Sequence, residues 1–307
     1  MEQSFVSQNT AENSIAKAIS IVQSAKTTAS EKTRSLFYLR CLDTEEAALA
    51  LEACITGTSV LIDHEVAYIL GQMKQKASVP FLLKLMADTS VDDIVRHEAI
   101  EALGNFEDTS LIESIQPHLQ DKNPIIYESA VLSIKKLQET DRLLKARQDS
   151  TKDNLLISKY QSRDPAFPFE GSFEDALAAL KSGNITEKYK AIFYFRDLNT
   201  KEAVDALASE FQADSDLLKH EIAYVFGQMQ NPYSVDALIK VLEDTSQATI
   251  VRHEAAEALG NIGTEEARLC LSNFLNSDIK IIRESASVGL GILNNDDNEY
   301  SNIDSLH

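Results

Sequence analysis

Apolar residues recur along most of the chain at intervals of three and four positions, which is the spacing of one face of an α-helix. Alanine, leucine and glutamate dominate these stretches, and Asp, Ser, Thr or Asn stands at the breaks between them. No stretch alternates between apolar and polar residues for long enough to predict a β-strand. The pattern therefore predicts an all-α protein.

The helical pattern occurs twice. Residues 31–130 align with residues 187–286 at a constant offset of 156 positions and without a gap. Four motifs carry this correspondence in two pairs: HEVAYILGQM (64–73) with HEIAYVFGQM (220–229), and HEAIEALGNF (97–106) with HEAAEALGNI (253–262). Within each half the two His-Glu pairs lie 33 residues apart, and a helical period of about 30 residues is typical of stacked hairpins. We therefore expect an α-α superhelix, a solenoid of eight HEAT-like helical hairpins in two pseudo-symmetric halves.

The same pattern divides the chain into four parts. We expect an N-terminal repeat half, a polar linker, a C-terminal repeat half and a disordered acidic tail, at residues 1–138, 139–171, 172–294 and 295–307. Pro165 and Pro168 lie in the linker, where they would interrupt any helix.

Composition indicates the cellular compartment of the protein and the classes of partner that it could bind. The net charge of −19 disfavours nucleic acid, because phosphate binding relies on Lys and Arg. The charge could serve solubility alone, or it could attract a cationic partner. The chain has no apolar run that could span a membrane and no secretory signal, and its three cysteines lack metal-site spacing. We expect a soluble cytoplasmic monomer, with the nucleus as a second compartment, that binds neither nucleic acid nor membrane.

The four His-Glu pairs lie off the apolar stripes of their helices. One such stripe consists of Ile62, Val66, Ile69 and Met73, and His64 falls about 180° away from it. By the repeat, His97, His220 and His253 lie likewise opposite their own stripes. In a solenoid, this face of the inner helices lines the concave groove. We therefore expect the histidines to share one groove, with four residues one turn further on at its border: Tyr68, Glu101, Tyr224 and Glu257.

Imidazole and carboxylate together are ligands for first-row metals. Neighbouring helices pack about 10 Å apart, which is within reach of two side chains meeting at one ion. Each half could therefore supply two His and one or two Glu, giving two similar metal sites that face each other. The zinc-protease pattern H-E-x-x-H is excluded, because no motif has a second histidine. Spacing does not choose between iron, manganese and zinc, and each His-Glu pair could instead brace its helix and recur through duplication.

At these four motifs the sequence resembles the deoxyhypusine hydroxylases, a family of HEAT-repeat di-iron monooxygenases, over about residues 31–294. The resemblance implies that two irons and O2 hydroxylate the deoxyhypusine side chain of translation factor 5A to form hypusine. It implies that one iron is held by His64, His97 and Glu98, and the other by His220, His253 and Glu254. It also implies that Glu65 and Glu221 bind the amines of the substrate; in a second reading of the family they are iron ligands too.

Two alternatives belong to other functional classes. A non-catalytic HEAT-repeat scaffold would bind no metal, and replacing His64 or His253 would have little effect on it. A helical-repeat bilin lyase would bind pigment, but that function gives no reason for His-Glu pairs in symmetric register. The substrate of the hydroxylase has two protonated amines, which an acidic groove with free carboxylates would favour.

Overall fold

The structure is a computed structural model of the 307-residue chain, and it describes residues 2–146, 158–160 and 162–294. The side chains of residues 2–12 and 146 are not described. The tail at 295–307, expected to be disordered, lies outside the described residues.

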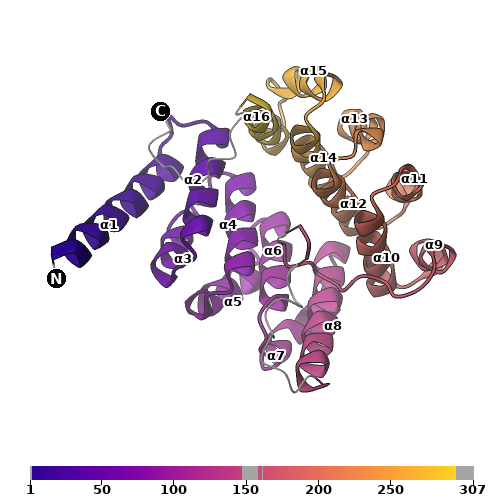
Figure 1. The fold of residues 1–307 in the computed structure, drawn as a ribbon, viewed down its shortest axis with the longest axis horizontal. Helices are drawn as coiled ribbons and strands as arrows, with labels where there is room; N and C mark the ends of the chain where they lie inside the picture. The colour runs from indigo at the N-terminus through magenta and orange to yellow at the C-terminus, as the bar shows by residue number, and fades with distance from the viewer. Residues whose placement is uncertain (1, 147–157, 161, 295–307) are drawn as a thin grey trace.

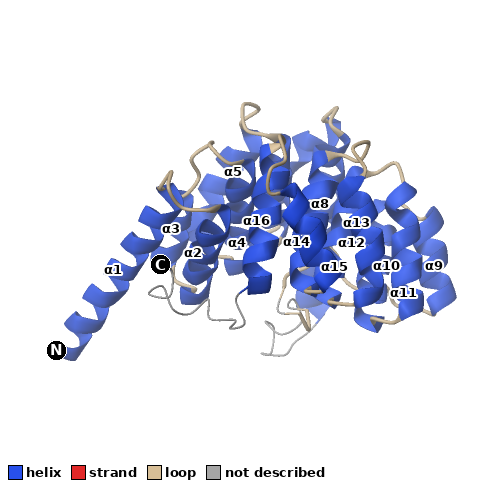
Figure 2. Ribbon diagram, turned by 90° about the horizontal axis from the view of Figure 1, so that it is seen from above, coloured by secondary structure: helices blue, strands red, loops and turns tan. Residues whose placement is uncertain are grey.

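The described residues form sixteen α-helices and no β-strand, which confirms the all-α prediction (Figure 2). The even-numbered helices form an inner layer: α2 (Ala29–Leu42), α4 (Val60–Met73), α6 (Asp93–Gly104), α8 (Pro124–Ala146), α10 (Ile185–Leu198), α12 (Asp216–Met229), α14 (Thr249–Ile262) and α16 (Lys280–Asn294). The odd-numbered helices cover it from outside: α1 (Glu2–Gln23), α3 (Glu45–Glu52), α5 (Val79–Ala87), α7 (Leu111–Ile115), α9 (Phe173–Ser182), α11 (Lys201–Ala208), α13 (Val235–Glu243) and α15 (Glu265–Phe274). Each outer helix and the inner helix after it form a hairpin, so the expected solenoid of eight hairpins is confirmed (Figure 1). None of the described helices combines the length and hydrophobicity needed to span a membrane.

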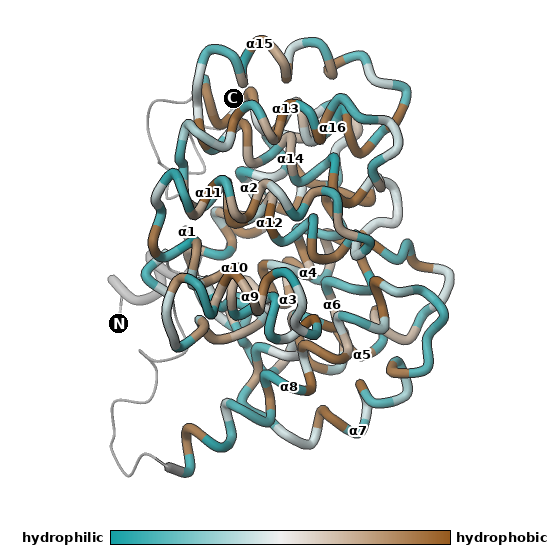
Figure 3. Tube along the Cα trace, turned by 90° about the vertical axis from the view of Figure 1, so that its right-hand side faces the viewer, coloured by the Kyte–Doolittle hydropathy of each residue, from teal (hydrophilic) through white to brown (hydrophobic). Residues whose placement is uncertain are grey.

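The helices of the two halves begin at matching signals. Thr28 and Glu31 form a capping box before α2, and Asn184 and Glu187 form one before α10. In each box the cap side chain accepts the N–H three residues on, and the glutamate accepts the N–H of the cap. Brown and teal segments then alternate along most helices in Figure 3, as expected of helices with one buried face.

The two halves meet at two equivalent interfaces. At one interface α16 packs against α2 and α4, and at the other α8 packs against α10 and α12 (Figure 1). The Ser59 hydroxyl donates to the Glu284 carboxylate at 2.7 Å, and the Ser215 hydroxyl donates to Glu128 at 2.6 Å. These pairs correspond under the 156-residue offset, and each serine also caps its own helix, α4 or α12. The concave faces of the two halves are therefore turned toward each other.

Within each half, glycines allow neighbouring inner helices to approach each other closely. A Cβ on Gly71 of α4 would lie 2.7 Å from the Cα of Ala102 in α6, and one on Gly260 of α14 would lie 2.3 Å from the Cα of Gly289 in α16. At such short distances a Cβ can be accommodated only if the neighbouring helix backbone shifts. The small residues in the GQM and ALG parts of the motifs thus set the helix spacing, and with it the spacing of the His-Glu pairs.

Replacing Gly260 with Ala should lower the free energy of unfolding by about 1–3 kcal/mol, because the new methyl group meets the α16 backbone. Gly227→Ala is the matched control. Its Cβ would lie 3.2 Å from the nearest atom, so the gain of about 1 kcal/mol in helix propensity should offset the contact. Thermal unfolding of both variants checks this difference, and equal melting temperatures would contradict it.

The region expected to be the linker, residues 139–171, begins with a helical segment. Helix α8 continues to Ala146, so residues 139–146 are helical. The stretch 139–171 is largely polar, which suggested a linker, but Glu139 is buried and accepts a hydrogen bond from Lys190 of α10 at 2.6 Å. The first residue of this helical segment thus pairs with a residue that lies far away in the sequence. The expected division of the chain at residues 138 and 171 stays a prediction.

Candidate metal centre

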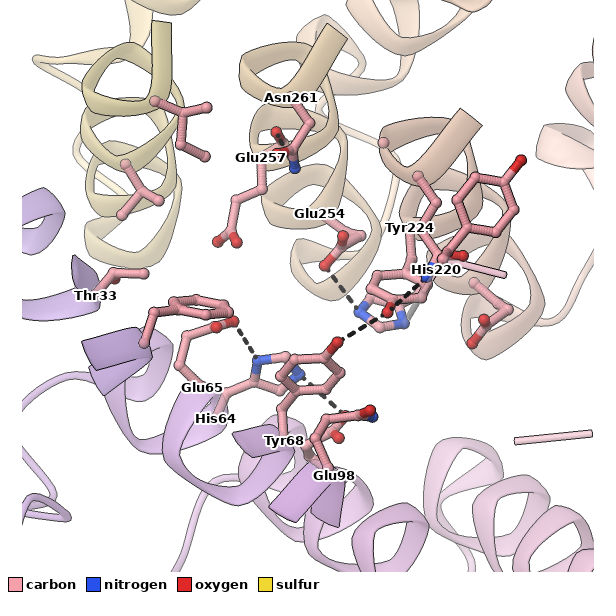
Figure 4. A pocket seen from close by; sticks show the side chains of 18 of the residues that line it. Thr33, His64, Glu65, Tyr68, Glu98, His220, Tyr224, Glu254, Glu257 and Asn261 are labelled. Carbon is pink, nitrogen blue, oxygen red and sulfur yellow. Dashed lines mark hydrogen bonds and ion pairs between the residues drawn. The ribbon is translucent and has the colours of Figure 1, made fainter. Parts of the chain in front are cut away.

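A cavity of about 500 Å³ lies between the two halves. Its walls come from inner helices of both halves and from Tyr160, Arg163 and Pro165, which precede α9 in the chain. His64 of α4 and His220 of α12 line the cavity (Figure 4). His97 of α6 and His253 of α14 are fully buried and do not line it. All four histidines were expected to line one groove; two of them line the cavity, and the other two are buried beside it. The structure adds that the opposite half covers this groove.

The four imidazole rings form one compact cluster. Within the halves, the ring centroids of His64 and His97 lie 5.6 Å apart, as do those of His220 and His253. Across the halves, the centroid distance is 5.3 Å from His64 to His253 and 5.5 Å from His97 to His220. Neighbours across the interface are thus as close as neighbours within a half.

Glutamates of the motifs lie against these rings in the same way in both halves. The Glu98 carboxylate is 3.4 Å from His64 Nε2, and the Glu254 carboxylate is 3.4 Å from His220 Nε2 (Figure 4). In each half, therefore, the second motif brings its glutamate to the histidine of the first motif. Glu65 differs from them, because its carboxylate lies 3.4 Å from Nδ1 of its own neighbour, His64.

The cluster has the chemistry of a metal site. Both ring nitrogens of His64, His97 and His253 are buried without a hydrogen-bond partner among the described residues, as is Nε2 of His220. Buried polar atoms left in this state are costly, and neutral imidazole nitrogen is a ligand for first-row metals. Burial lowers the pKa of His97 and of His253 well below its usual value, which keeps these rings neutral. The residues therefore fit a metal centre.

Charge is unevenly distributed within the cluster. Burial acts to lower the pKa of His64, but Glu65 and Glu98 raise it well above its usual value. Burial, together with neighbouring carboxylates, raises the pKa of Glu221 well above its usual value. The centre thus has a surplus of carboxylates, which a cation would stabilise.

Three groups of side chains bring their ligand atoms within 4.8 Å of one another: His64 with His97 and His220, His220 with His253 and Glu254, and His97 with Glu98 and Glu101. The second group is the triad expected for the C-terminal half. The first group combines histidines of both halves. The six expected ligands therefore all occur in these groups, and Glu65 and Glu221 line the adjoining cavity, while the division of the ligands between two ions stays a prediction.

Glu101 and Glu257, which were expected at the border of the groove, also contact the histidines, a role that was not predicted from the sequence. Each lies one turn after a fully buried histidine, and its carboxylate is 3.7 Å from Nδ1 of that histidine, His97 or His253. A serine from the next inner helix, Ser129 or Ser285, donates to each carboxylate at 3.0 Å. Carboxylates in this position orient the imidazoles that bind metals. The signal that could have revealed them is the i, i+4 His/Glu spacing, which occurs only in the second motif of each half.

Comparisons with known proteins agree with this geometry. Residues 204–291 match the HEAT repeats family, and residues 95–121 match the PBS lyase HEAT-like repeat family. The deoxyhypusine hydroxylase of Candida albicans is 37% identical over 94% of this chain and 92% of its own length. That of Danio rerio is 34% identical, with the same coverage of both chains. The structure of human deoxyhypusine hydroxylase in complex with glycerol superposes with a TM-score of 0.86 at 29% identity, over 94% of this chain and 99% of the human one. The chain therefore belongs to the deoxyhypusine hydroxylase family.

Proposed function

We propose that this protein hydroxylates the deoxyhypusine side chain of translation factor 5A, with two irons and O2, and so completes hypusine. The observation that carries the proposal is the cluster of four buried imidazoles and adjoining carboxylates, in a chain that belongs to the deoxyhypusine hydroxylase family. We expect it to act as a cytoplasmic monomer on a protein substrate.

Six side chains would hold the irons. One iron would be bound by His64, His97 and Glu98, and the other by His220, His253 and Glu254. Bound iron would supply the activation of O2 for insertion of one oxygen atom into a C–H bond. The second oxygen atom leaves as water, with two electrons and two protons from an external reductant. Carboxylates beside Nδ1 of His97 and His253, from Glu101 and Glu257, would hold these two rings in the orientation that directs Nε2 to the metal.

The cavity suits a long side chain with two ammonium groups. Glu65 and Glu221 lie on its wall, on opposite halves, and both are buried. An ammonium group beside Glu221 would stabilise its ionised form against the burial that raises its pKa. Phe37, Val288 and Ile292 also line the cavity and would contact the methylene groups. We infer that the glutamates bind the two amines and so hold the carbon chain beside the irons.

Metal analysis and turnover of the purified protein test this proposal. We expect about two irons per chain and a visible colour in air, since ferric di-iron sites absorb visible light through ligand-to-metal charge transfer. With O2 and a reductant, the protein should add one oxygen atom to a translation factor that carries deoxyhypusine, as read by mass spectrometry.

The matched control for turnover is the same factor with unmodified lysine, which should gain no oxygen. Protein that holds no metal, with no effect of replacing His64 or His253, would favour the non-catalytic scaffold instead. Full hydroxylation by iron-free protein would contradict the metal assignment.

A further inference from the structure

A chain of hydrogen bonds runs from a buried ion pair to the cavity. The Arg196 side chain is fully buried, and its Nη1 lies 2.8 Å from the Asp164 carboxylate. The same Nη1 donates to Oε1 of Gln228 at 3.0 Å. A guanidinium can only donate, so the atom of Gln228 that faces it must be the oxygen. Arg196 therefore determines which way the Gln228 amide points.

This orientation directs the amide NH2 of Gln228 toward the cavity. Its Nε2 donates one hydrogen to the Ser162 hydroxyl at 2.9 Å and the other to the Tyr224 hydroxyl at 3.0 Å. The Tyr224 oxygen must therefore be an acceptor. In the other half the equivalent residue, Gln72, bonds to the backbone of Arg163 instead, through Oε1 at 2.8 Å and Nε2 at 3.3 Å. Gln228 thus links Tyr224 to Ser162, whereas among the described residues Gln72 makes no such bond to Tyr68.

The hydroxyls of Tyr68 and Tyr224 meet across the two halves at 2.9 Å (Figure 4). The pair has two hydroxyl hydrogens, and the bond between the two oxygens uses one of them. Whichever tyrosine donates, one hydrogen is left without an acceptor among the described residues. Burial raises the pKa of Tyr68 to about 12, and that of Tyr224 well above its usual value, so both hydroxyls stay protonated at neutral pH.

The remaining hydrogen lies at the wall of the cavity. Tyr68 and Tyr224 follow His64 and His220 by one turn on α4 and α12, and all four line the same cavity. Figure 4 shows the two rings reaching toward each other beside these imidazoles. The carboxylates that line the cavity are acceptors fixed to the protein, but among the described residues neither tyrosine hydroxyl donates to one of them.

We propose that the Tyr68–Tyr224 pair donates its one free hydrogen to an anionic or oxygen ligand at the metal centre. The inference rests on the proposed function, since it needs a metal-bound acceptor at this place. The pair can deliver the hydrogen from either half, because the bond between the hydroxyls can reverse its direction. The pair therefore acts as one donor shared by two residues.

Azide binding to the ferric protein tests the proposal, because azide is an anionic acceptor with its own absorption band on ferric iron. The variants Tyr68→Phe and Tyr224→Phe each keep one hydroxyl, and each should weaken azide binding by at most about threefold. The double variant keeps no donor and should weaken it by about tenfold or more, since a hydrogen bond to a charged group is lost. The signature is an effect of the double variant that exceeds the product of the single effects.

A purely structural clasp predicts a different result. Either single variant would remove the bond between the halves, lower the melting temperature by a few degrees, and leave azide affinity unchanged. Tyr189→Phe is the matched control: this buried hydroxyl donates to Leu217 O at 3.1 Å outside the cavity, so its loss should affect stability alone. Equal azide affinity in the wild type and all three variants overturns this inference and leaves the proposed function standing. A wild type without iron overturns both.

Discussion

Replacing His220 and His253 together with alanine should remove about half of the bound iron and reduce hydroxylation more than about a thousandfold, because oxygen activation needs both ions. The iron that remains should be held by His64, His97 and Glu98. Iron per chain and product formation measure the two effects. Distance alone does not assign each iron to one half. The ring centroids of His64 and His253, across the halves, lie 5.3 Å apart, whereas those of His64 and His97, within one half, lie 5.6 Å apart.

The matched control is His118→Ala, which removes a histidine from outside the cavity. It should keep both irons and full activity. Loss of both irons from the double variant would show that each ion takes ligands from both halves. The group formed by His64, His97 and His220 would then describe one ion better than the division by halves does.

Replacing Glu65 or Glu221 with glutamine should weaken binding of the substrate protein by about a hundredfold, while both irons are retained. The reason is the loss of a buried carboxylate opposite an ammonium group, which costs about 2–5 kcal/mol when one partner of such a pair is removed. Glutamine keeps the size of the side chain, so the change isolates the charge. Affinity for the factor that carries deoxyhypusine and iron per chain are measured on the same preparations.

Glu210→Gln is the control for this pair of variants. Glu210 is also buried, but it pairs with Lys181 and Lys188 outside the cavity. It should affect stability and leave substrate affinity unchanged. If the Glu65 and Glu221 variants lose iron as fully as histidine variants do, all four motif glutamates are iron ligands and the assignment to substrate amines is wrong.

The local pattern of the sequence was sufficient to predict the fold class, and it singled out the histidines that the fold brings into one cluster. Apolar spacing reports which face of a helix is buried, and it predicted the eight hairpins. The duplication at a fixed offset singled out the four His-Glu pairs and placed them at matching positions in the two halves. The position of His64 opposite its apolar stripe showed that it points away from the core of its own half. Each of these signals lies within one helix or one repeat, where neighbouring residues constrain one another directly.

Contacts between distant segments were decided only by the tertiary structure. No periodicity could show that the ring centroids of His64 and His253 lie 5.3 Å apart. That distance depends on how the two halves meet, at interfaces that include the hydrogen bonds of Ser59 to Glu284 and of Ser215 to Glu128. The contact of Glu139 with Lys190 likewise joins two helices of different halves. The bond between Tyr68 and Tyr224 joins residues 156 positions apart in the chain. The pattern along the chain determines on which face of its helix a side chain lies, whereas the packing of whole helices determines which residues that face contacts.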